Sequence, residues 1–471
     1  MNDLTFLSAS EMAAHVRQKK ISPVDLVNSH FARIEKLNSR LNAYIALDEE
    51  RARRDARTLE AEAGAGHFRG PLHGVPISIK SSVETTGLPW EAGTRLRAGT
   101  IAAKDAVLVS RLRHAGAIVL GVTNTPELLM AWETDNLLYG RTNNPWDVTR
   151  TAGGSSGGES AAIASGISAG GVGSDGGGSI RVPAHFTGIC GLKPTPGRIP
   201  ATGHFPVGAG PFALLGVVGP MARTIPDLQI LFEVMAGADD GDPCSAPVPV
   251  RRINRADLKT IRIGYFEDDG RTPVTPETRI AVQKAAEALA RAGLQVDPFR
   301  PEGLEQARQL WWQFFGIAGG MILGPLASGH ENDISPILRE FLSWASAEPA
   351  HTGHSLLETW LQRDQLRTRV LSQMQDCPIL LCPAAAIPAF RHGERQWMIE
   401  GKTVKYLDAW SYTEWFNVLG NPAAVVPVGQ STDGLPIGVQ IVGRPWEEEL
   451  VLAIAEEVEG ECGGFRAPSV V

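Results

Sequence analysis

Thirteen glycines fall between Gly153 and Gly191, and three of them stand in a row before a serine in the segment GVGSDGGGSIR, residues 171–181. A glycine run weakens any helix or strand that contains it. Without Cβ atoms, consecutive residues can turn their backbone N–H groups toward one point and can approach another molecule closely. The stretch is therefore expected to form either a simple flexible turn or a backbone cradle with a chemical role.

Two familiar glycine motifs occur in this part of the chain, and both fit poorly. Residues 171–176 satisfy G-x-G-x-x-G, but a dinucleotide site needs an acidic residue about 20 positions further on, where Lys193 and Arg198 stand instead. Residues 153–157 satisfy G-x-S-x-G, but a nucleophile elbow needs a strand that runs directly into its serine, and NNPWDVTRTA is a poor strand. Neither motif explains the glycines well.

The row of glycines before Ser179 suits the stabilisation of a negatively charged oxygen. The backbone N–H groups of Gly176, Gly177, Gly178 and Ser179 can converge on one point and form an oxyanion hole. A hydroxyl beside such a hole is well placed to attack a carbonyl carbon. Ser179 is therefore a candidate nucleophile.

A serine nucleophile needs a proton acceptor, and the sequence offers a histidine or a lysine. His185 is close in sequence but lies in a proline-bounded stretch, which favours a packed loop histidine. Lys80 ends the apolar segment GVPISIK, which reads as a strand. Burial at such a place removes hydration, lowers the pKa of a lysine and lets it be neutral near pH 7. A solvated lysine at the end of a strand is the alternative.

Helical and strand patterns alternate along the chain, so the predicted class is α/β. Residues 8–60 read as helices, and most of residues 303–376 also read as helical and contain many Trp and Phe. The strands are predicted elsewhere, at residues 74–80, 117–122, 262–267, 294–299, 378–383, 423–429 and 436–443. No low-complexity linker surrounds the glycine-rich centre, which favours one large domain.

Composition narrows the class of protein. The 471 residues include 44 Lys and Arg against 52 Asp and Glu, without a basic block, so a nucleic-acid partner is not expected. No signal peptide or membrane span is read from the sequence. The five cysteines are scattered and odd in number, which is typical of reduced thiols in the cytoplasm. No set of metal ligands is evident.

Three segments, GPLHGVPISIKSSVETTG, GGSSGGESAAIASG and GSDGGGSIRVPAHFTGICGLKPT, occur in this order, and the chain resembles the amidase signature family. The similarity extends from about Ser10 to Glu459 and is weakest between about 245 and 375. It implies a large mixed central β-sheet with helices on both faces, in a single domain over residues 1–471. The catalytic core would occupy about 70–240, and a variable, mostly helical, pocket-forming region about 300–376.

The resemblance also implies roles for individual residues. Ser179 matches the family's nucleophile, Lys80 its base, and Ser155 the serine that bridges them after a cis peptide bond. In the segment TPELLMAW, Leu129 and Met130 align with a loop that flanks the substrate, although they also suit plain core positions.

The implied reaction is hydrolysis of a carboxylic amide through a Ser179 acyl-enzyme, without a cofactor. The alternative within the family is an amidotransferase A-type subunit, which releases ammonia for a partner. A homodimer is possible in either case. The sequence leaves the substrate open among aliphatic amides, anilides, ureas, hydrazides and esters.

Overall fold

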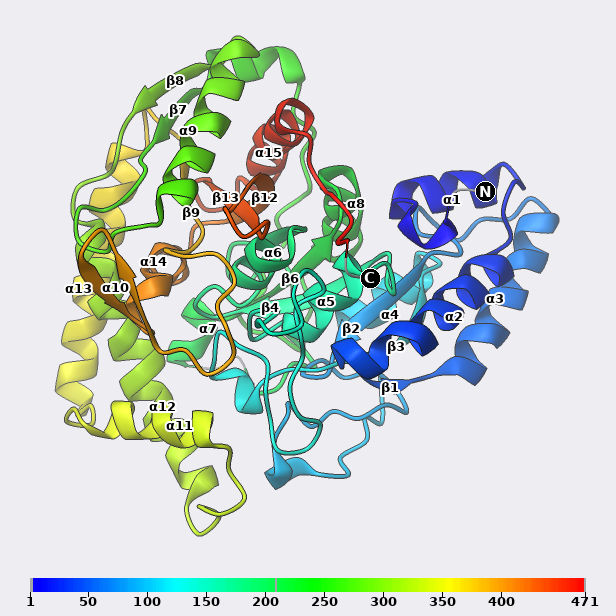
Figure 1. Ribbon diagram of the computed structural model, residues 1–471, viewed down its shortest axis with the longest axis horizontal. Coiled ribbons are helices and arrows are strands. Elements are labelled where there is room, and N and C mark those ends of the chain that lie inside the picture. Colours follow the sequence, from blue (N-terminus) through cyan, green and yellow to red (C-terminus); the bar gives the residue numbers. More distant parts are fainter. Residues whose placement is uncertain (1–2, 208–209, 470–471) are drawn as a thin grey trace.

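The computed structural model describes residues 3–207 and 210–469, which form one mixed eleven-stranded β-sheet and its flanking helices (Figure 1). Across the sheet the strands follow the order β1-β3-β2-β4-β6-β5-β12-β13-β9-β7-β8. Their bounds are Tyr44–Leu47 (β1), Pro76–Lys80 (β2), Ile118–Thr123 (β3), Gly170–Asp175 (β4), Cys190–Lys193 (β5), Val217–Ala222 (β6), Arg262–Tyr265 (β7), Gln295–Pro298 (β8), Ile379–Pro383 (β9), Ala423–Gln430 (β12) and Pro436–Val442 (β13). Gln396–Ile399 (β10) and Lys402–Lys405 (β11) form a separate antiparallel hairpin.

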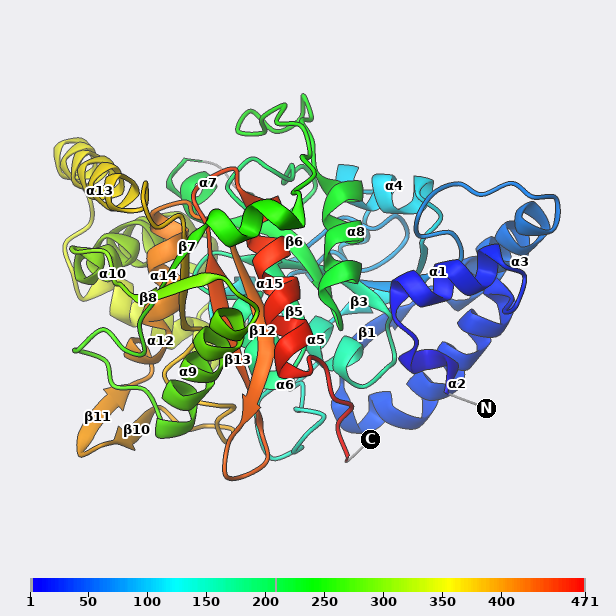
Figure 2. The same ribbon diagram turned by 90° about the horizontal axis from the view of Figure 1, so that it is seen from above.

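Helices cover both faces of this sheet. They are Ala9–Arg17 (α1), Pro23–Leu41 (α2), Glu49–Gly64 (α3), Val107–His114 (α4), Gly157–Ala164 (α5), Arg181–Thr187 (α6), Pro211–Leu215 (α7), Ile225–Met235 (α8), Pro276–Arg291 (α9), Leu304–Trp312 (α10), Gly319–Ala327 (α11), Pro336–Ser346 (α12), Gly353–Gln373 (α13), Ser411–Val418 (α14) and Glu448–Cys462 (α15). Helices α8, α9 and α15 share one apolar cluster with the strands and lie side by side (Figure 2). Helices α5 and α6 contribute to a different cluster.

The side chains of β2 alternate, so that apolar residues lie on one face of the sheet and polar residues lie on the other. Ile77 and Ile79 join the apolar cluster that contains α8, α9 and α15. Successive side chains of a strand point to opposite faces, so Ser78 and Lys80 face the other way. Ser78 accordingly contacts Glu159 of α5. The last residue of β2 is therefore delivered into the interior on the side of α5.

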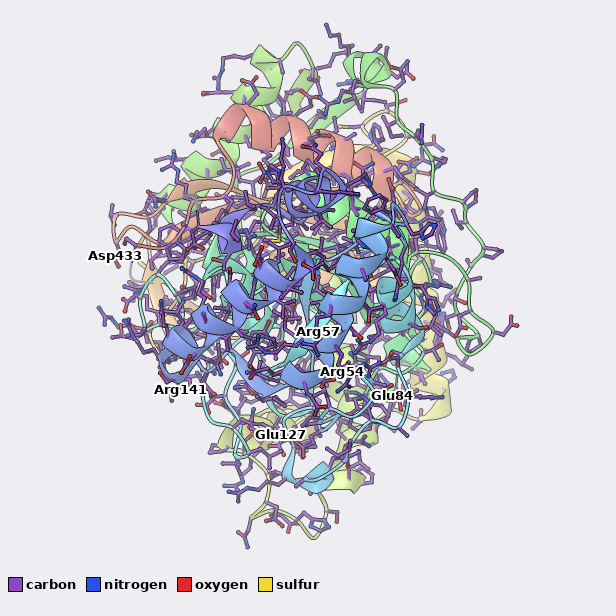
Figure 3. The ribbon with its side chains drawn as sticks, turned by 90° about the vertical axis from the view of Figure 1, so that its right-hand side faces the viewer. Arg54, Arg57, Glu84, Glu127, Arg141 and Asp433 are labelled. Carbon is purple, nitrogen blue, oxygen red and sulfur yellow. The ribbon has the colours of Figure 1, made fainter. Side chains whose placement is uncertain are left out.

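The N-terminal helices form one end of the molecule and begin at clear capping residues. Ser8 and Glu11 form a capping box at α1, and Ser22 caps α2 directly before Pro23. In α3, Ala52, Ala56 and Leu59 are buried, whereas Arg54 and Arg57 extend from the outer side (Figure 3). The charged residues of this end thus lie on its surface and the alanines pack inward.

Helices α10 to α14 form an aromatic-rich layer beyond the α6 side of the sheet, and Trp311, Phe314 and Phe315 are buried in it. Within the described residues, Leu304–Ala327 is the one helical segment long and apolar enough to cross a membrane. Its most apolar stretch is 56% buried inside the protein. A core helix meets the same criteria of length and composition.

The predicted α/β class and each predicted strand are confirmed, but two segments differ from expectation. Residues 8–60 were expected to be helical, and they also contain β1, which adds an edge strand beside β3. The glycine-rich stretch contains β4, a strand that pairs with both β2 and β6. A side chain at Gly171 would place its Cβ 1.9 Å from Glu159 Oε1 and 2.3 Å from the Ser78 carbonyl oxygen. Close packing of the strand on its neighbours therefore accounts for glycine there.

Candidate active site

Lys80 lies at the C-terminal end of β2 and is fully buried. Its Nζ lies within hydrogen-bond distance of three hydroxyls: Ser155 Oγ at 2.7 Å, Ser156 Oγ at 3.0 Å and Ser174 Oγ at 3.0 Å. Burial lowers its pKa from 10.5 to about 7, while the negative charges of Asp175 and Glu159 act in the opposite direction. An amine in this environment can accept a proton near neutral pH.

Two of the hydroxyls around Lys80 are neighbours in sequence, and only one of them faces the cavity. The Gly154–Ser155 peptide bond is cis, and Ser155 lines a cavity of about 70 Å³. Ser156 instead turns toward the backbone of β4, where its Oγ lies 3.3 Å from both the nitrogen and the oxygen of Ser174. Of these two neighbours, Ser155 is therefore the one that connects the lysine with the cavity, and Ser174, the third hydroxyl, also lines it.

Ser179 lies between β4 and α6 and lines the same cavity as Ser155. Its carbonyl accepts a hydrogen bond from the Ser156 N–H at 3.1 Å, which ties the two serine motifs together. His185, the alternative base, contacts the backbone of Gly438 and Ile387 and does not line this cavity. The residues expected as nucleophile and bridge, Ser179 and Ser155, thus line one cavity, and the expected base, Lys80, contacts Ser155 from behind it.

Two indole N–H groups and a threonine hydroxyl donate hydrogen bonds to backbone carbonyls of the glycine loop, residues 176–178. The carbonyl of Gly176 accepts from Trp311 Nε1 at 2.7 Å. The carbonyl of Gly177 accepts from Trp132 Nε1 at 2.8 Å and from Thr413 Oγ1 at 3.0 Å. Because the N–H and C=O of one peptide point in opposite directions, anchoring a carbonyl also orients the N–H of the next residue. The Gly177 N–H therefore points away from Trp311.

The position of Gly178 corrects part of the expected oxyanion hole. Its N–H donates to Asp175 Oδ1 at 2.7 Å and so is not available to a substrate oxygen. Gly178 has φ +115°, a conformation that a side chain rarely permits. Gly178 thus shapes the loop, and the donors that remain are the N–H groups of Gly176, Gly177 and Ser179.

A buried ion pair stabilises the base of this loop. Arg181 binds Asp175 through Nε at 3.0 Å and Nη2 at 2.9 Å, and neither side chain is exposed. The amide of Asn417 in α14 donates to the same carboxylate at 3.0 Å. Arg181 holds the pKa of Asp175 far below its usual range although burial opposes this, so the carboxylate stays charged.

The walls of the cavity are mostly apolar. Leu129 and Met130 line it, as expected for a substrate-flanking loop, and Phe212, Val217 and Phe315 add further apolar surface. His204 and Pro206, from the segment after β5, also line the cavity. The cavity therefore suits an apolar group next to the reactive hydroxyls.

Near Lys80, the buried carboxylate of Glu159 in α5 accepts hydrogen bonds from two strands of the sheet. Its carboxylate accepts from Ser78 Oγ at 2.6 Å on β2 and from Thr123 Oγ1 at 2.7 Å on β3. Burial raises its pKa to about 7, although the hydroxyl donors and Lys80 act in the opposite direction. Glu159 thus links neighbouring strands and places an acidic group behind the lysine.

Sequence reasoning missed the residues that support the site. Trp132, Trp311, Thr413 and Asn417 act on backbone groups from segments far apart in the chain. The aromatic stretch at 311–315 lies in the region expected to be helical and pocket-forming, where Trp311 is buried and Phe315 lines the cavity. The signal that was available was its position in an otherwise helical region, which does not reveal an indole N–H donor.

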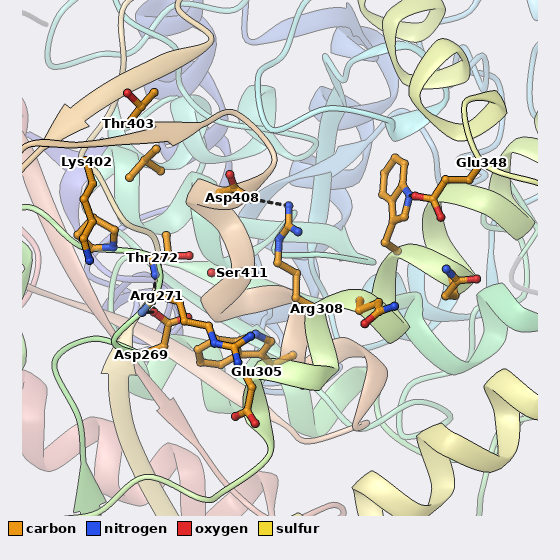
Figure 4. A pocket seen from close by; sticks show the side chains of 16 residues that line it. Asp269, Arg271, Thr272, Glu305, Arg308, Glu348, Lys402, Thr403, Asp408 and Ser411 are labelled. Carbon is orange, nitrogen blue, oxygen red and sulfur yellow. Dashed lines mark hydrogen bonds and ion pairs between the residues drawn. The ribbon is translucent and has the colours of Figure 1, made fainter.

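A second and larger cavity, of about 610 Å³, lies between α10, α14 and β11 (Figure 4). Its lining is rich in charges, and Arg308 binds Asp408 at 2.7 Å. None of the three expected catalytic residues lines it. Within the described residues, no group of three or more His, Cys, Asp or Glu is placed to hold a metal ion.

Known proteins resemble this chain over nearly its whole length. A family model described as Amidase matches residues 25–452. An acylamidase of Rhodococcus erythropolis is 35% identical, covering 97% of this chain and 96% of that protein. The A-type subunit of the glutamyl-tRNA(Gln) amidotransferase of Salinispora arenicola is 30% identical, covering 100% of each. The solved structure of a bacterial aryl acylamidase of the amidase signature family superposes with a TM-score of 0.86 at 28% identity, covering 97% of this chain and 96% of that one.

The fold and these relatives define a hydrolase that acts on amide carbon–nitrogen bonds. Because the superposition covers nearly the whole chain, the large mixed sheet expected from the sequence is confirmed as the fold. The chain belongs to the amidase family. The resemblance inferred from the sequence, and the amidase activity it implied, are thereby confirmed.

Proposed function

We propose that this amidase uses Ser179 as nucleophile, Ser155 as proton relay and neutral Lys80 as base. Lys80 accepts a proton from Ser155 while Ser155 takes one from Ser179, whose oxygen attacks the amide carbonyl. The ammonium of Lys80 then returns its proton through Ser155 to the departing nitrogen, which leaves as a neutral amine. Water hydrolyses the acyl-enzyme by the same relay.

The tetrahedral oxygen would be stabilised by the N–H groups of Gly177 and Ser179, with Gly176 beside them. These donors sit on a loop whose carbonyls are held by Trp311, Trp132 and Thr413 before any substrate arrives. Donors fixed in advance need no reorganisation when charge develops on the oxygen. The support from behind the loop is therefore part of the proposed catalytic arrangement.

One observation carries this proposal: the Nζ of a fully buried lysine lies 2.7 Å from Ser155 Oγ, and Ser155 shares a cavity with Ser179. The test is mass detection of an acyl adduct on Ser179 during turnover of an activated amide, together with Lys80→Ala and Ser179→Ala. Both variants should keep the fold and lose most activity. Parent-like amide hydrolysis by Lys80→Ala would refute the assignment of the base.

We propose an acyl amide with an apolar group as the substrate class. The apolar walls around Met130, Phe212 and Phe315 support it, as do the relatives named acylamidase and aryl acylamidase. A panel of anilides, alkyl amides, ureas and esters with one common acyl group would rank the classes. We further propose a cytoplasmic location, supported by five cysteines that are all free thiols; a homodimer would be tested by sedimentation.

The second candidate is an amidotransferase A-type subunit, favoured by the Salinispora arenicola relative that the chain covers from end to end. Such a protein would release ammonia from glutamine for a partner. The purified chain alone, assayed on glutamine and on simple anilides, separates the two. Turnover of anilides without a partner supports the acyl amidase, and turnover of glutamine only in a complex supports the alternative.

A further inference from the structure

His204 is a polar group of the cavity that the proposed mechanism does not use. It lies in the segment after β5, where its backbone bridges to Val83, and it lines the cavity with Ser155 and Ser179. Its Nδ1 lies 3.0 Å from the carbonyl oxygen of Pro206. A carbonyl only accepts, so Nδ1 carries the hydrogen, and in the neutral ring Nε2 is left as an acceptor.

The Nε2 of His204 is shielded from solvent, yet it has no hydrogen-bond partner within the described part of the chain. Burial, together with the charge of Lys80, lowers the pKa of His204 to about 4, so the ring is neutral near pH 7. An acceptor that is buried and left unpaired is costly, and polar groups of this kind usually have a partner in the functional state. A donor brought by the substrate would supply it.

The neighbours of His204 indicate which part of the substrate it meets. The bridge partner of His204, Val83, donates its N–H to the Lys80 carbonyl at 2.9 Å, which places His204 near the Lys80 end of the cavity. In the proposed relay this end returns the proton to the departing nitrogen by way of Ser155. The leaving-group nitrogen therefore lies on the side of the cavity where His204 offers its acceptor.

We propose that His204 Nε2 accepts a hydrogen bond from the N–H of the scissile amide, a role that rests on the proposed Ser179 mechanism. When Ser179 adds to the carbonyl, the nitrogen becomes pyramidal and its lone pair must face Ser155 to receive the proton. The N–H then points away from Ser155, and an acceptor there holds the nitrogen in the productive orientation. No proton moves to His204, and the contact reaches this alignment only after the nitrogen has lost its planarity.

This contact gives the enzyme a preference among substrate classes. Primary and secondary amides carry the N–H that His204 requires. Esters and N-alkylated anilides carry none at the scissile position, and they would leave Nε2 unpaired. We therefore expect selection for N–H-bearing amides over esters of the same acyl group, beyond what the intrinsic reactivity of the two bonds produces.

The test compares a secondary anilide, its N-methyl analogue and the matching aryl ester in parent enzyme, His204→Leu and His204→Gln. His204→Leu removes the acceptor, and kcat/KM for the anilide should fall about tenfold, mostly in kcat, with the ester changed less than about twofold. His204→Gln offers a carbonyl oxygen and should restore part of the loss. The N-methyl anilide should be insensitive to both substitutions.

Each other outcome overturns the inference. Equal losses for anilide and ester would show a structural role, and an unchanged anilide rate would show that Nε2 does not meet the nitrogen. If His204→Leu does not fold, the ratio of anilide to ester turnover in His204→Ala, which also lacks the acceptor, decides the question in the same way. Failure of the underlying mechanism is seen separately, because Ser179→Ala would then still hydrolyse both substrates.

Discussion

The pH dependence of kcat/KM provides the sharpest test of Lys80. The base must be neutral to accept a proton, so activity should be lost as pH falls through its pKa. An ordinary lysine has a pKa of 10.5, and burial brings that of Lys80 to about 7. At pH 7 about half of the molecules would then carry a neutral Lys80, against about one in 3,000 for an ordinary lysine.

The predicted profile rises about tenfold per pH unit below about pH 6, bends near pH 7 and is flat above about pH 8. It is measured by release of an aniline chromophore at substrate concentrations well below KM. Because Glu159 has a pKa in the same range, the midpoint belongs to the coupled pair. His204, with its pKa near 4, is neutral throughout this window.

A second buried lysine supplies a matched control. Lys193 also has its pKa lowered to about 7 by burial, but its Nζ donates only to the Pro194 carbonyl, at 2.9 Å, among the described residues. Lys193→Met should leave the midpoint of the pH profile unchanged. Lys80→Met should abolish the activity, so that no pH profile remains to be measured. Parent-like kcat/KM at pH 5, or a midpoint that moves only with Lys193, would refute the reasoning.

Three further predictions concern the surroundings of the site. Glu159→Gln removes a negative charge that raises the pKa of Lys80, so the midpoint of kcat/KM should move to lower pH. Gly178→Ala should cost at least tenfold in kcat, because its Cβ would lie 2.4 Å from Thr413 Oγ1 at φ +115°, a strain of about 1–3 kcal/mol. Asp175→Asn leaves a buried guanidinium without its counter-charge and should lower the free energy of unfolding by about 3–5 kcal/mol in urea.

Controls make these three outcomes decisive. Gly353→Ala adds a methyl group where nothing lies within 4 Å and should leave kcat unchanged. A midpoint that moves to higher pH in Glu159→Gln would contradict the sign of the electrostatic argument. Equal kcat in Gly178→Ala and parent would show that the loop tolerates a side chain, and an unchanged urea midpoint in Asp175→Asn would show that the ion pair contributes nothing net.

The residues proposed to react could be selected from the sequence because each belongs to a local pattern. Lys80 ends an alternating strand, and Ser179 follows a row of glycines, so a short window contains the signal. The donor at Gly178 was predicted wrongly, because Asp175 competes for the same N–H three residues away. That competition depends on how the loop folds back on itself, and alternation or composition does not encode it.

The supporting residues could not be predicted, and their placement links substrate binding with catalysis. Trp311 anchors the Gly176 carbonyl and also stacks on Phe315, with ring centroids 4.6 Å apart. Phe315 lines the cavity, so a substrate that displaces its ring also presses on the indole that orients the proposed oxyanion donors. Both aromatic residues belong to the helical region that the sequence predicts to be variable and pocket-forming, whereas Lys80 and Ser179 lie in the motifs. Changes that adapt this region to a new acyl group would therefore alter kcat together with KM, because the contact between Phe315 and Trp311 affects both substrate binding and the orientation of the proposed oxyanion donors.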